Sequence, residues 1–153
     1  MLEQLLIGSA LLIATTVAHS LVTALLLWLL RTLRASNRVL RQLWAKTGLV
    51  AGLVLVLFLA ALVEVALWAI AYIKVGAIDG FEPALYFSMV TFTTLGYGDV
   101  VLTDAWRLLA SFEAATGIIV FGWTTAIIIA LVQHMVHLQQ GAPAPPGEVG
   151  QAG

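Results

Sequence analysis

Three long apolar runs constrain the fold of this chain more than any other feature. The first runs from Leu5 to Leu30, the second from about Gly48 to Tyr72, and the third from about Ala105 to Val132. A hydrocarbon core of ~30 Å needs about 20 mostly apolar residues in helical conformation, so each run is long enough to cross it. We therefore predict an all-α membrane protein with three transmembrane helices.

The composition excludes several classes of protein. Of 153 residues, 61% are hydrophobic and only 10% are charged, whereas an ordinary soluble domain carries roughly 25% charged residues. The chain has no cysteine, so it offers no disulfide framework, thiolate metal site or cysteine nucleophile. No hydrolytic triad can be assembled either. We expect no enzyme, no cofactor and no organic substrate.

The basic residues predict an orientation in the membrane. Arginine and lysine collect on the cytoplasmic side, so the segment 31–47 should lie inside. This puts the N-terminus outside and the C-terminus in the cytoplasm, and it explains the basic cluster without nucleic acid. Tryptophans fall near both predicted interfaces, as an aromatic belt requires. The residues concerned are Arg31, Arg34, Arg38, Arg41 and Lys46, and Trp28, Trp44, Trp68, Trp106 and Trp123.

The basic segment and the C-terminal tail permit separate predictions. The four arginines recur at spacings of three and four, so residues 31–45 suit a helix lying on the inner leaflet. The alternative is a solvated linker. The tail, residues 139–153, is rich in Gly, Ala and Pro, and we expect it to be disordered.

Between the second and third runs lies a segment that is too short to span. A helix of about eleven residues within 82–93, with Pro83 in its first turn, would be roughly 16 Å long, about half a bilayer. Thr93-Thr94-Leu95-Gly96-Tyr97-Gly98-Asp99 follows it. Glycines at alternate positions permit backbone conformations barred to other residues. Successive carbonyls can then point to one side, and four such strands around an axis would present rings of oxygen to a cation.

At this motif the sequence resembles the potassium channel family, whose filter sequence T-V-G-Y-G differs only by Val in place of Leu95. The resemblance covers about residues 46–138 and implies a two-transmembrane pore domain with an additional N-terminal helix at its periphery. The implied divisions are an N-terminal transmembrane helix 1–30, the basic segment 31–47, and a pore domain 48–138. Within the pore domain they are an outer helix 48–72, a re-entrant pore helix 82–93, a filter 94–99 and an inner helix 104–138.

The resemblance also implies the roles of the filter residues. K⁺ would be held by the carbonyls of Thr94, Leu95, Gly96 and Tyr97 and by the Thr94 hydroxyl, in an ion-binding segment that includes Gly98. Tyr86 aligns opposite Asp99 and could donate its hydroxyl to that carboxylate. Phe87 has no donor, so Tyr97 must rely on Thr91. The filter-support residues are Asp99, Tyr86, Thr91 and Thr93.

Glycines and ionisable residues inside the spans are candidates for gating. Gly117 and Gly122 are either hinges of the inner helix or close-packing positions. Glu64 and Glu113 lie at comparable depth, where they either sense pH or pair with polar groups beside the pore helix. The alternative is that one or both are protonated, hydrogen-bonded structural acids. His134 and His137 share a helical face near the inner mouth, where four protonated copies would repel. The alternative is two interfacial polar residues.

These observations predict a potassium-selective channel subunit of the cell membrane, assembling as a homotetramer in the lipid bilayer. K⁺ is its permeant ion, conducted passively. Two alternatives stay open. One is a potassium transporter subunit, which usually fuses four unlike pore repeats. The other is a non-conducting membrane scaffold or accessory channel subunit, which would leave the Gly-Tyr-Gly strand without a purpose.

Overall fold

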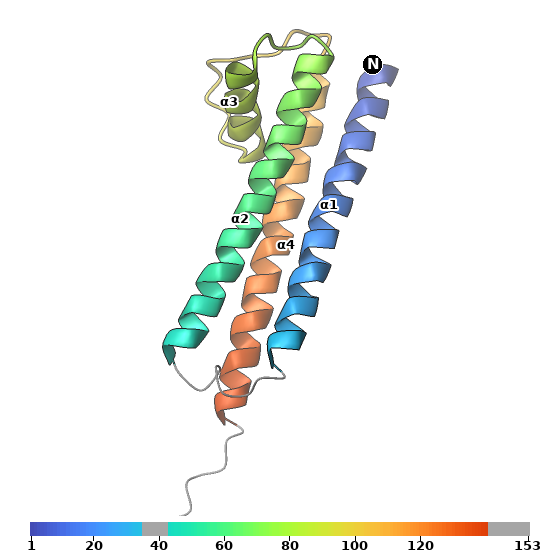
Figure 1. The fold of residues 1–153 in the computed structure, drawn as a ribbon. Helices are drawn as coiled ribbons and strands as arrows, with labels where there is room; N and C mark the ends of the chain where they lie inside the picture. Colours follow the sequence, from blue (N-terminus) through green and yellow to red (C-terminus); the bar gives the residue numbers. More distant parts are fainter. Residues whose placement is uncertain (35–42, 141–153) are drawn as a thin grey trace, which may run out of the picture.

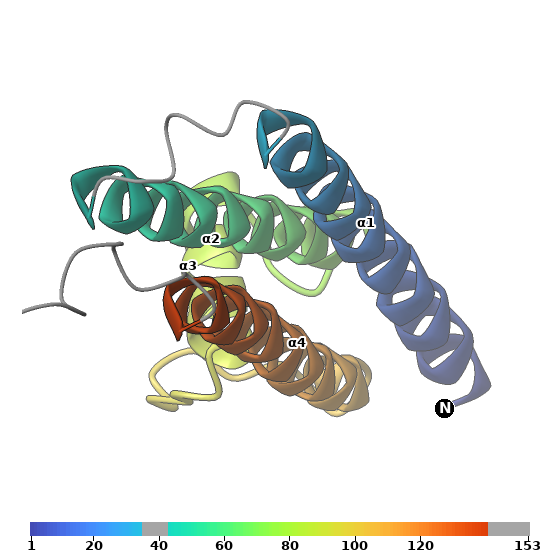
Figure 2. The ribbon, with the colours of Figure 1, turned by 90° about the horizontal axis from the view of Figure 1, so that it is seen from below.

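The computed structural model describes residues 1–34 and 43–140, and this part of the chain is all-helical. Four helices follow in order: α1 (Leu2–Arg34), α2 (Leu43–Lys74), α3 (Phe81–Phe92) and α4 (Arg107–Gln140). The helices α1, α2 and α4 are long and apolar enough to cross a membrane. Figure 1 shows these three side by side, with α3 next to one end of α2 and α4. Seen along the bundle, α3 overlaps α2 and α4 and stands clear of α1 (Figure 2).

The helix bounds differ from the predicted ones at several ends. The inner helix begins at Arg107 rather than at residue 104, because the N–H groups of Trp106 and Arg107 both donate to the Thr103 carbonyl in a preceding turn. The two ends of the basic segment belong to α1 and α2. Its centre, residues 35–42, lies outside the described residues, as does the tail from residue 141 onward.

A glycine ends α2 and another precedes α3. Gly76 has φ +69°, and the bonds from Ala77 N to Tyr72 O (2.9 Å) and from Gly76 N to Ile73 O (3.0 Å) form a Schellman motif, which terminates a helix. Gly80 has φ +90° and caps α3. These two sharp changes of direction turn the chain back beside α2, so that α3 lies against it.

The main core lies where α2, α3 and α4 meet. Phe87 and Phe92 of α3 are buried against Trp68 and Tyr72 of α2, and Leu109 of α4 joins them. The Tyr72 and Phe87 rings meet edge to face at 5.1 Å between centroids. Trp68 is completely buried in this core, and its place in an outer aromatic belt stays a prediction.

The additional helix α1 is fastened along α4. Near its start, the Gln4 side chain accepts a hydrogen bond at 3.2 Å from the backbone N–H of Leu108, one of the unpaired donors at the beginning of α4. One turn further, α1 and α4 approach closely. A Cβ on Gly8 would lie only 2.7 Å from the Phe112 ring. Glycine is therefore required at this crossing.

Candidate functional site

The segment after α3 has an alternating backbone. Thr94, Gly96 and Gly98 have φ values of +60°, +57° and +78°, whereas Leu95 and Tyr97 between them do not have positive φ. The conformation of Thr94 is uncommon for a residue other than glycine and carries strain. All five residues, 94–98, are exposed on the surface of the single chain. The two glycines therefore occupy two of the positions where this alternation requires a left-handed residue.

Hydrogen bonds at the start of this segment determine where its carbonyls point. The N–H groups of Thr94, Leu95 and Gly96 donate back into the last turn of α3, to Thr91 O at 2.9 Å and to Val90 O at 2.9 and 3.2 Å. The peptide bonds are trans, so each N–H is opposed by the carbonyl of the preceding residue. The carbonyls of Thr93, Thr94 and Leu95 consequently point away from α3, towards the exposed side.

A side-chain bond ties the far end of the segment to α3. The Tyr86 hydroxyl donates to Asp99 Oδ2 at 2.7 Å. This bond lowers the pKa of Asp99, because it stabilises the ionised carboxylate, and it raises the pKa of Tyr86. The segment is thus attached to α3 by backbone bonds at its beginning and by this pair at its end.

Between these two attachments the segment stands off from the helices behind it. A cavity of about 200 Å³ separates Gly96 and Gly98 from Val90 of α3 and Ala110 of α4. Within the described chain Tyr97 forms no hydrogen bond with Thr91, and its side chain is 66% exposed. The Thr93 hydroxyl bonds to Met89 O at 2.8 Å, at the end of α3.

Glu113 joins α4 to the short helix and to α2. Its buried carboxyl accepts a hydrogen bond from Tyr72 of α2 at 2.6 Å and another from Ser88 of α3. The Ser88 hydroxyl also contacts the Val65 carbonyl at 2.7 Å. Glu113 therefore pairs with polar groups beside the short helix. The sequence did not single out Ser88 or Tyr72 as its partners, since neither belongs to a recognisable motif.

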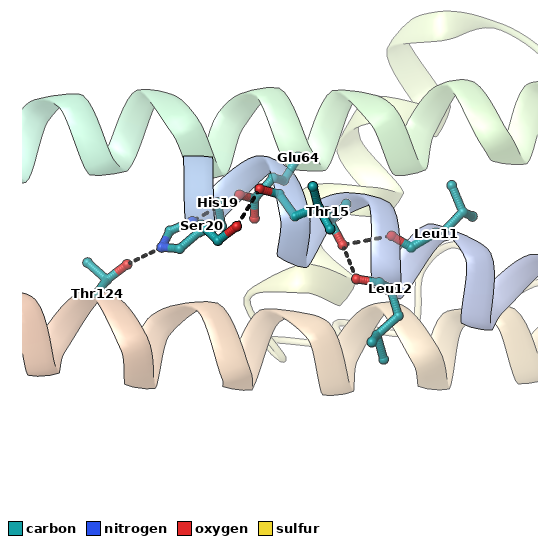
Figure 3. A network of polar contacts seen from close by, with 8 residues as sticks. Leu11, Leu12, Thr15, His19, Ser20, Glu64 and Thr124 are labelled. Atoms are coloured by element: carbon teal, nitrogen blue, oxygen red, sulfur yellow. Dashed lines mark hydrogen bonds and ion pairs between the residues drawn. The ribbon is translucent and has the colours of Figure 1, made fainter. Parts of the chain in front are cut away.

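Glu64 has a partner on a different helix. His19 Nδ1 of α1 lies 2.9 Å from Glu64 Oε1 of α2, and both side chains are buried. The other ring nitrogen, Nε2, lies 3.4 Å from the Thr124 hydroxyl of α4. Figure 3 shows the His19 imidazole between α2 and α4. The sequence placed both groups in apolar spans, and this was the signal that they needed partners.

Of the two hinge candidates, one is in close contact with the site. A Cβ on Gly117 would lie 1.9 Å from the Phe92 carbonyl at the end of α3, whereas a Cβ on Gly122 would meet nothing within 4 Å. Close approach of α4 to α3 therefore requires glycine at 117. His134 and His137 belong to α4, but their side chains lie outside the described part. No metal-binding cluster of three His, Asp or Glu occurs in the described residues.

Comparison with known proteins places the chain in a family. A family model described as "Ion channel" matches residues 49–134, which include α3, the segment after it and most of α2 and α4. The chain belongs to this ion channel family. Its members are channels, so this chain is a channel protein rather than an enzyme. The helix α1 lies outside the match.

A curated relative bears out the resemblance to potassium channels. Over 63 residues, our chain is 36% identical to Two-pore potassium channel 4 of Arabidopsis thaliana. The alignment covers 40% of this chain and 21% of the relative, so the chain spans about a fifth of that protein's length. No solved structure matches it significantly.

Proposed function

We propose that this chain is a subunit of a K⁺-selective channel that conducts passively through a pore built by four copies. The observation that carries the proposal is the direction of the carbonyls after α3. The N–H groups of the same peptide bonds donate to the Thr91 and Val90 carbonyls, so the oxygens are directed to the exposed side. There, rings of carbonyls can replace the hydration shell of K⁺. One strand covers only one side of an ion, and cyclic closure of four copies supplies the ring.

The end of α3 favours a cation over an anion. A helix C-terminus carries roughly −0.5 elementary charge, because its last carbonyls lack intrahelical partners. The helix α3 ends at Phe92, directly before the carbonyl segment. In the proposed assembly four such ends surround the inner end of the pore, with α3 entering the membrane halfway and the chain returning to the same side.

Ion flux into liposomes containing only the purified chain tests the proposal. We expect K⁺ flux that barium blocks, with Na⁺ flux much smaller. Gly96→Ala should abolish it, because an alanine at φ +57° disturbs the alternating backbone. Gly76→Ala is the matched control: it has φ +69° and, like Gly96, open space around its Cβ, but it lies in the turn after α2.

Three outcomes would contradict parts of the proposal. Equal fluxes of Na⁺ and K⁺ would overturn selectivity, and flux that survives Gly96→Ala would mean that the filter is misassigned. The protein mass of the detergent-solubilised complex should be four times 16.3 kDa, and any other multiple would overturn the tetramer. Absence of flux from an intact tetramer would favour the non-conducting accessory subunit instead.

The gating residues enter the proposal as candidates. Bending at Gly117 or Gly122 of the inner helix would widen the pore, and protonation of Glu64, Glu113, His134 or His137 would make conduction depend on pH. The close contact of Gly117 with Phe92 means that bending there would also move the end of α3. For Glu113, the pH profile of flux through the Glu113→Gln channel is decisive, since an unaltered profile removes Glu113 as a sensor.

A further inference from the structure

A groove lies between α1 and α4 at the end of the bundle opposite α3. It has a volume of about 510 Å³ and is lined chiefly by apolar side chains, including Leu27 of α1 and Trp123 of α4. Arg31 of α1 is its one charged lining residue. In Figure 1 this is the lower part of the bundle, where the lighter blue end of α1 lies beside the orange-red part of α4. The volume is within the ~300–1,000 Å³ range of small-molecule sites.

Small residues of α4 leave the groove open. Towards α3, three contacts hold α1 and α4 together. They are the hydrogen bond from Leu108 N to the Gln4 side chain, the packing of Gly8 against Phe112, and the contact of His19 with the Thr124 hydroxyl. Beyond Trp123, the lining residues of α4 include Ala126 and Ala130. These two alanines are one turn apart on the same face. Their methyl groups are too small to fill the space beside α1.

Within the described residues, no carboxylate lies at the level of Arg31 in the bundle. The acidic residues of the described chain lie in the halves of α2 and α4 nearer α3, at the start of α1, or in α3 and the connections around it. They are Glu3, Glu64, Asp79, Glu82, Asp99, Asp104 and Glu113. A second copy of these helices would therefore offer Arg31 no carboxylate. A phospholipid offers a phosphate at the membrane interface, and arginine binds phosphate with two parallel hydrogen bonds.

We propose that this groove is a binding site for an anionic glycerophospholipid of the leaflet at the Arg31 end. One acyl chain lies along Ala126 and Ala130 between α1 and α4, and the phosphate contacts Arg31. The α1 side of the site lies outside the residues that match the ion channel family, so the site belongs to the additional helix. The proposal does not depend on conduction, because lipid binding is measured directly.

Trp123 provides a reporter at the site. Phosphatidylglycerol with brominated acyl chains quenches nearby tryptophan, and the difference between the wild type and Trp123→Phe isolates the Trp123 signal. In phosphatidylcholine vesicles, we expect this signal to saturate at a lower fraction of brominated phosphatidylglycerol than of brominated phosphatidylcholine. Arg31→Gln should raise the half-saturating fraction of phosphatidylglycerol about fivefold. The control Lys74→Gln removes an exposed charge at the opposite end of the bundle and should change nothing.

Filling the groove tests the acyl-chain part of the site. Ala130→Leu should remove Trp123 quenching, whereas Ala14→Leu, on an exposed face of α1, should leave it intact. Ala126→Val serves as the second variant if Ala130→Leu lowers the helix content measured by circular dichroism. Identical curves for the two lipids, an unchanged Arg31→Gln variant, or quenching that survives the filled groove would overturn the proposal. Absence of quenching by either lipid would mean that a second copy occupies the groove.

Discussion

Ionisable residues buried within the spans reach partners on other helices. Glu113 of α4 is bonded by Tyr72 and Ser88, and Glu64 of α2 is paired with His19. An unpaired carboxylate at membrane depth is costly, so such residues are either paired or functional. Sequence position revealed that Glu64 and Glu113 needed partners. His19 lies 45 residues from Glu64, and Tyr72 lies 41 residues from Glu113. Only the packing of the helices brings them together.

The bond between Tyr86 and Asp99 predicts an effect of acid on the segment after α3, which we propose as the filter. The pKa of Asp99 is lowered by the hydroxyl of Tyr86, so the stabilisation is present above the ordinary aspartate pKa and is lost as pH falls through the lowered value. Tyr86→Phe should raise the pKa of Asp99 and move acid-induced loss of K⁺ flux to higher pH. A ¹³C NMR titration of the Asp99 carboxyl measures this shift.

A matched variant shows whether the effect is local. Tyr72→Phe also removes one tyrosine hydroxyl, but that hydroxyl bonds to Glu113, so the titration of Asp99 should be unchanged. If the Asp99 pKa is the same in Tyr86→Phe as in the wild type, the hydrogen bond from Tyr86 does not cause the lowered pKa of Asp99.

The two glycines of α4 should respond in opposite ways to alanine. Gly117→Ala places a methyl group 1.9 Å from the Phe92 carbonyl, and forcing this backbone apart should cost about 1–3 kcal/mol of unfolding free energy. Gly122→Ala meets nothing within 4 Å and should gain up to about 1 kcal/mol of helix propensity. Thermal unfolding in detergent micelles measures both. Equal destabilisation by the two variants would contradict the packing role of Gly117.

At the scale of elements, α1 and α3 are positioned by different means. The helix α3 is held by the buried aromatic core and by the contact of the Ser88 hydroxyl with the Val65 carbonyl of α2. The helix α1 is held by polar groups at intervals along its length, Gln4 near its start and His19 in its middle. Helices in lipid gain little from apolar contact with each other, so small residues and hydrogen bonds decide how they associate. In α1, Gly8 is such a small residue and His19 forms such a hydrogen bond.

The pair formed by His19 and Glu64 predicts a non-additive double mutant. His19→Leu leaves Glu64 buried without its partner and should cost roughly 3–5 kcal/mol of unfolding free energy. In the double variant, His19→Leu with Glu64→Leu, two apolar side chains replace the pair, and stability should return close to the wild type. Reversible unfolding in micelles gives the coupling energy.

The control for this cycle lies one residue along α1. Ser20 bonds only to the Val17 carbonyl of its own helix, so Ser20→Leu should have little effect. If the double variant loses the sum of the two single losses, the two side chains are not coupled and α1 is held by its other contacts.

At the scale of the whole molecule, one chain leaves most of its spans uncovered. Within the most apolar window of each span, 17%, 28% and 22% of the residues are buried in α1, α2 and α4. Lipid and, in our proposal, neighbouring copies cover the rest. The carbonyl segment is likewise exposed in one chain, which is what a pore formed between copies requires.

The proposed orientation can be tested because the chain contains no cysteine. We propose that the end with α3 is outside the cell and the end with Arg31 inside, on the strength of the basic cluster. A membrane-impermeant maleimide should label Asp79→Cys, an exposed position before α3, in intact cells. Thr32→Cys, exposed at the end of α1, should be labelled only after permeabilisation. The reverse pattern would invert the topology.

The sequence by itself determined the membrane class, the three spans, the short helix and the glycine motif that follows it. Each follows from local properties: apolar length, a proline in a first turn, and glycines at alternate positions. The pair of Tyr86 and Asp99 could also be proposed, because the family resemblance aligns them. Tertiary structure decided the rest. It brought Gly117 against the Phe92 carbonyl, paired Glu64 with His19, and opened the groove at Arg31. These depend on which faces of distant helices meet, and apolar spans with little periodic contrast do not specify that from sequence alone.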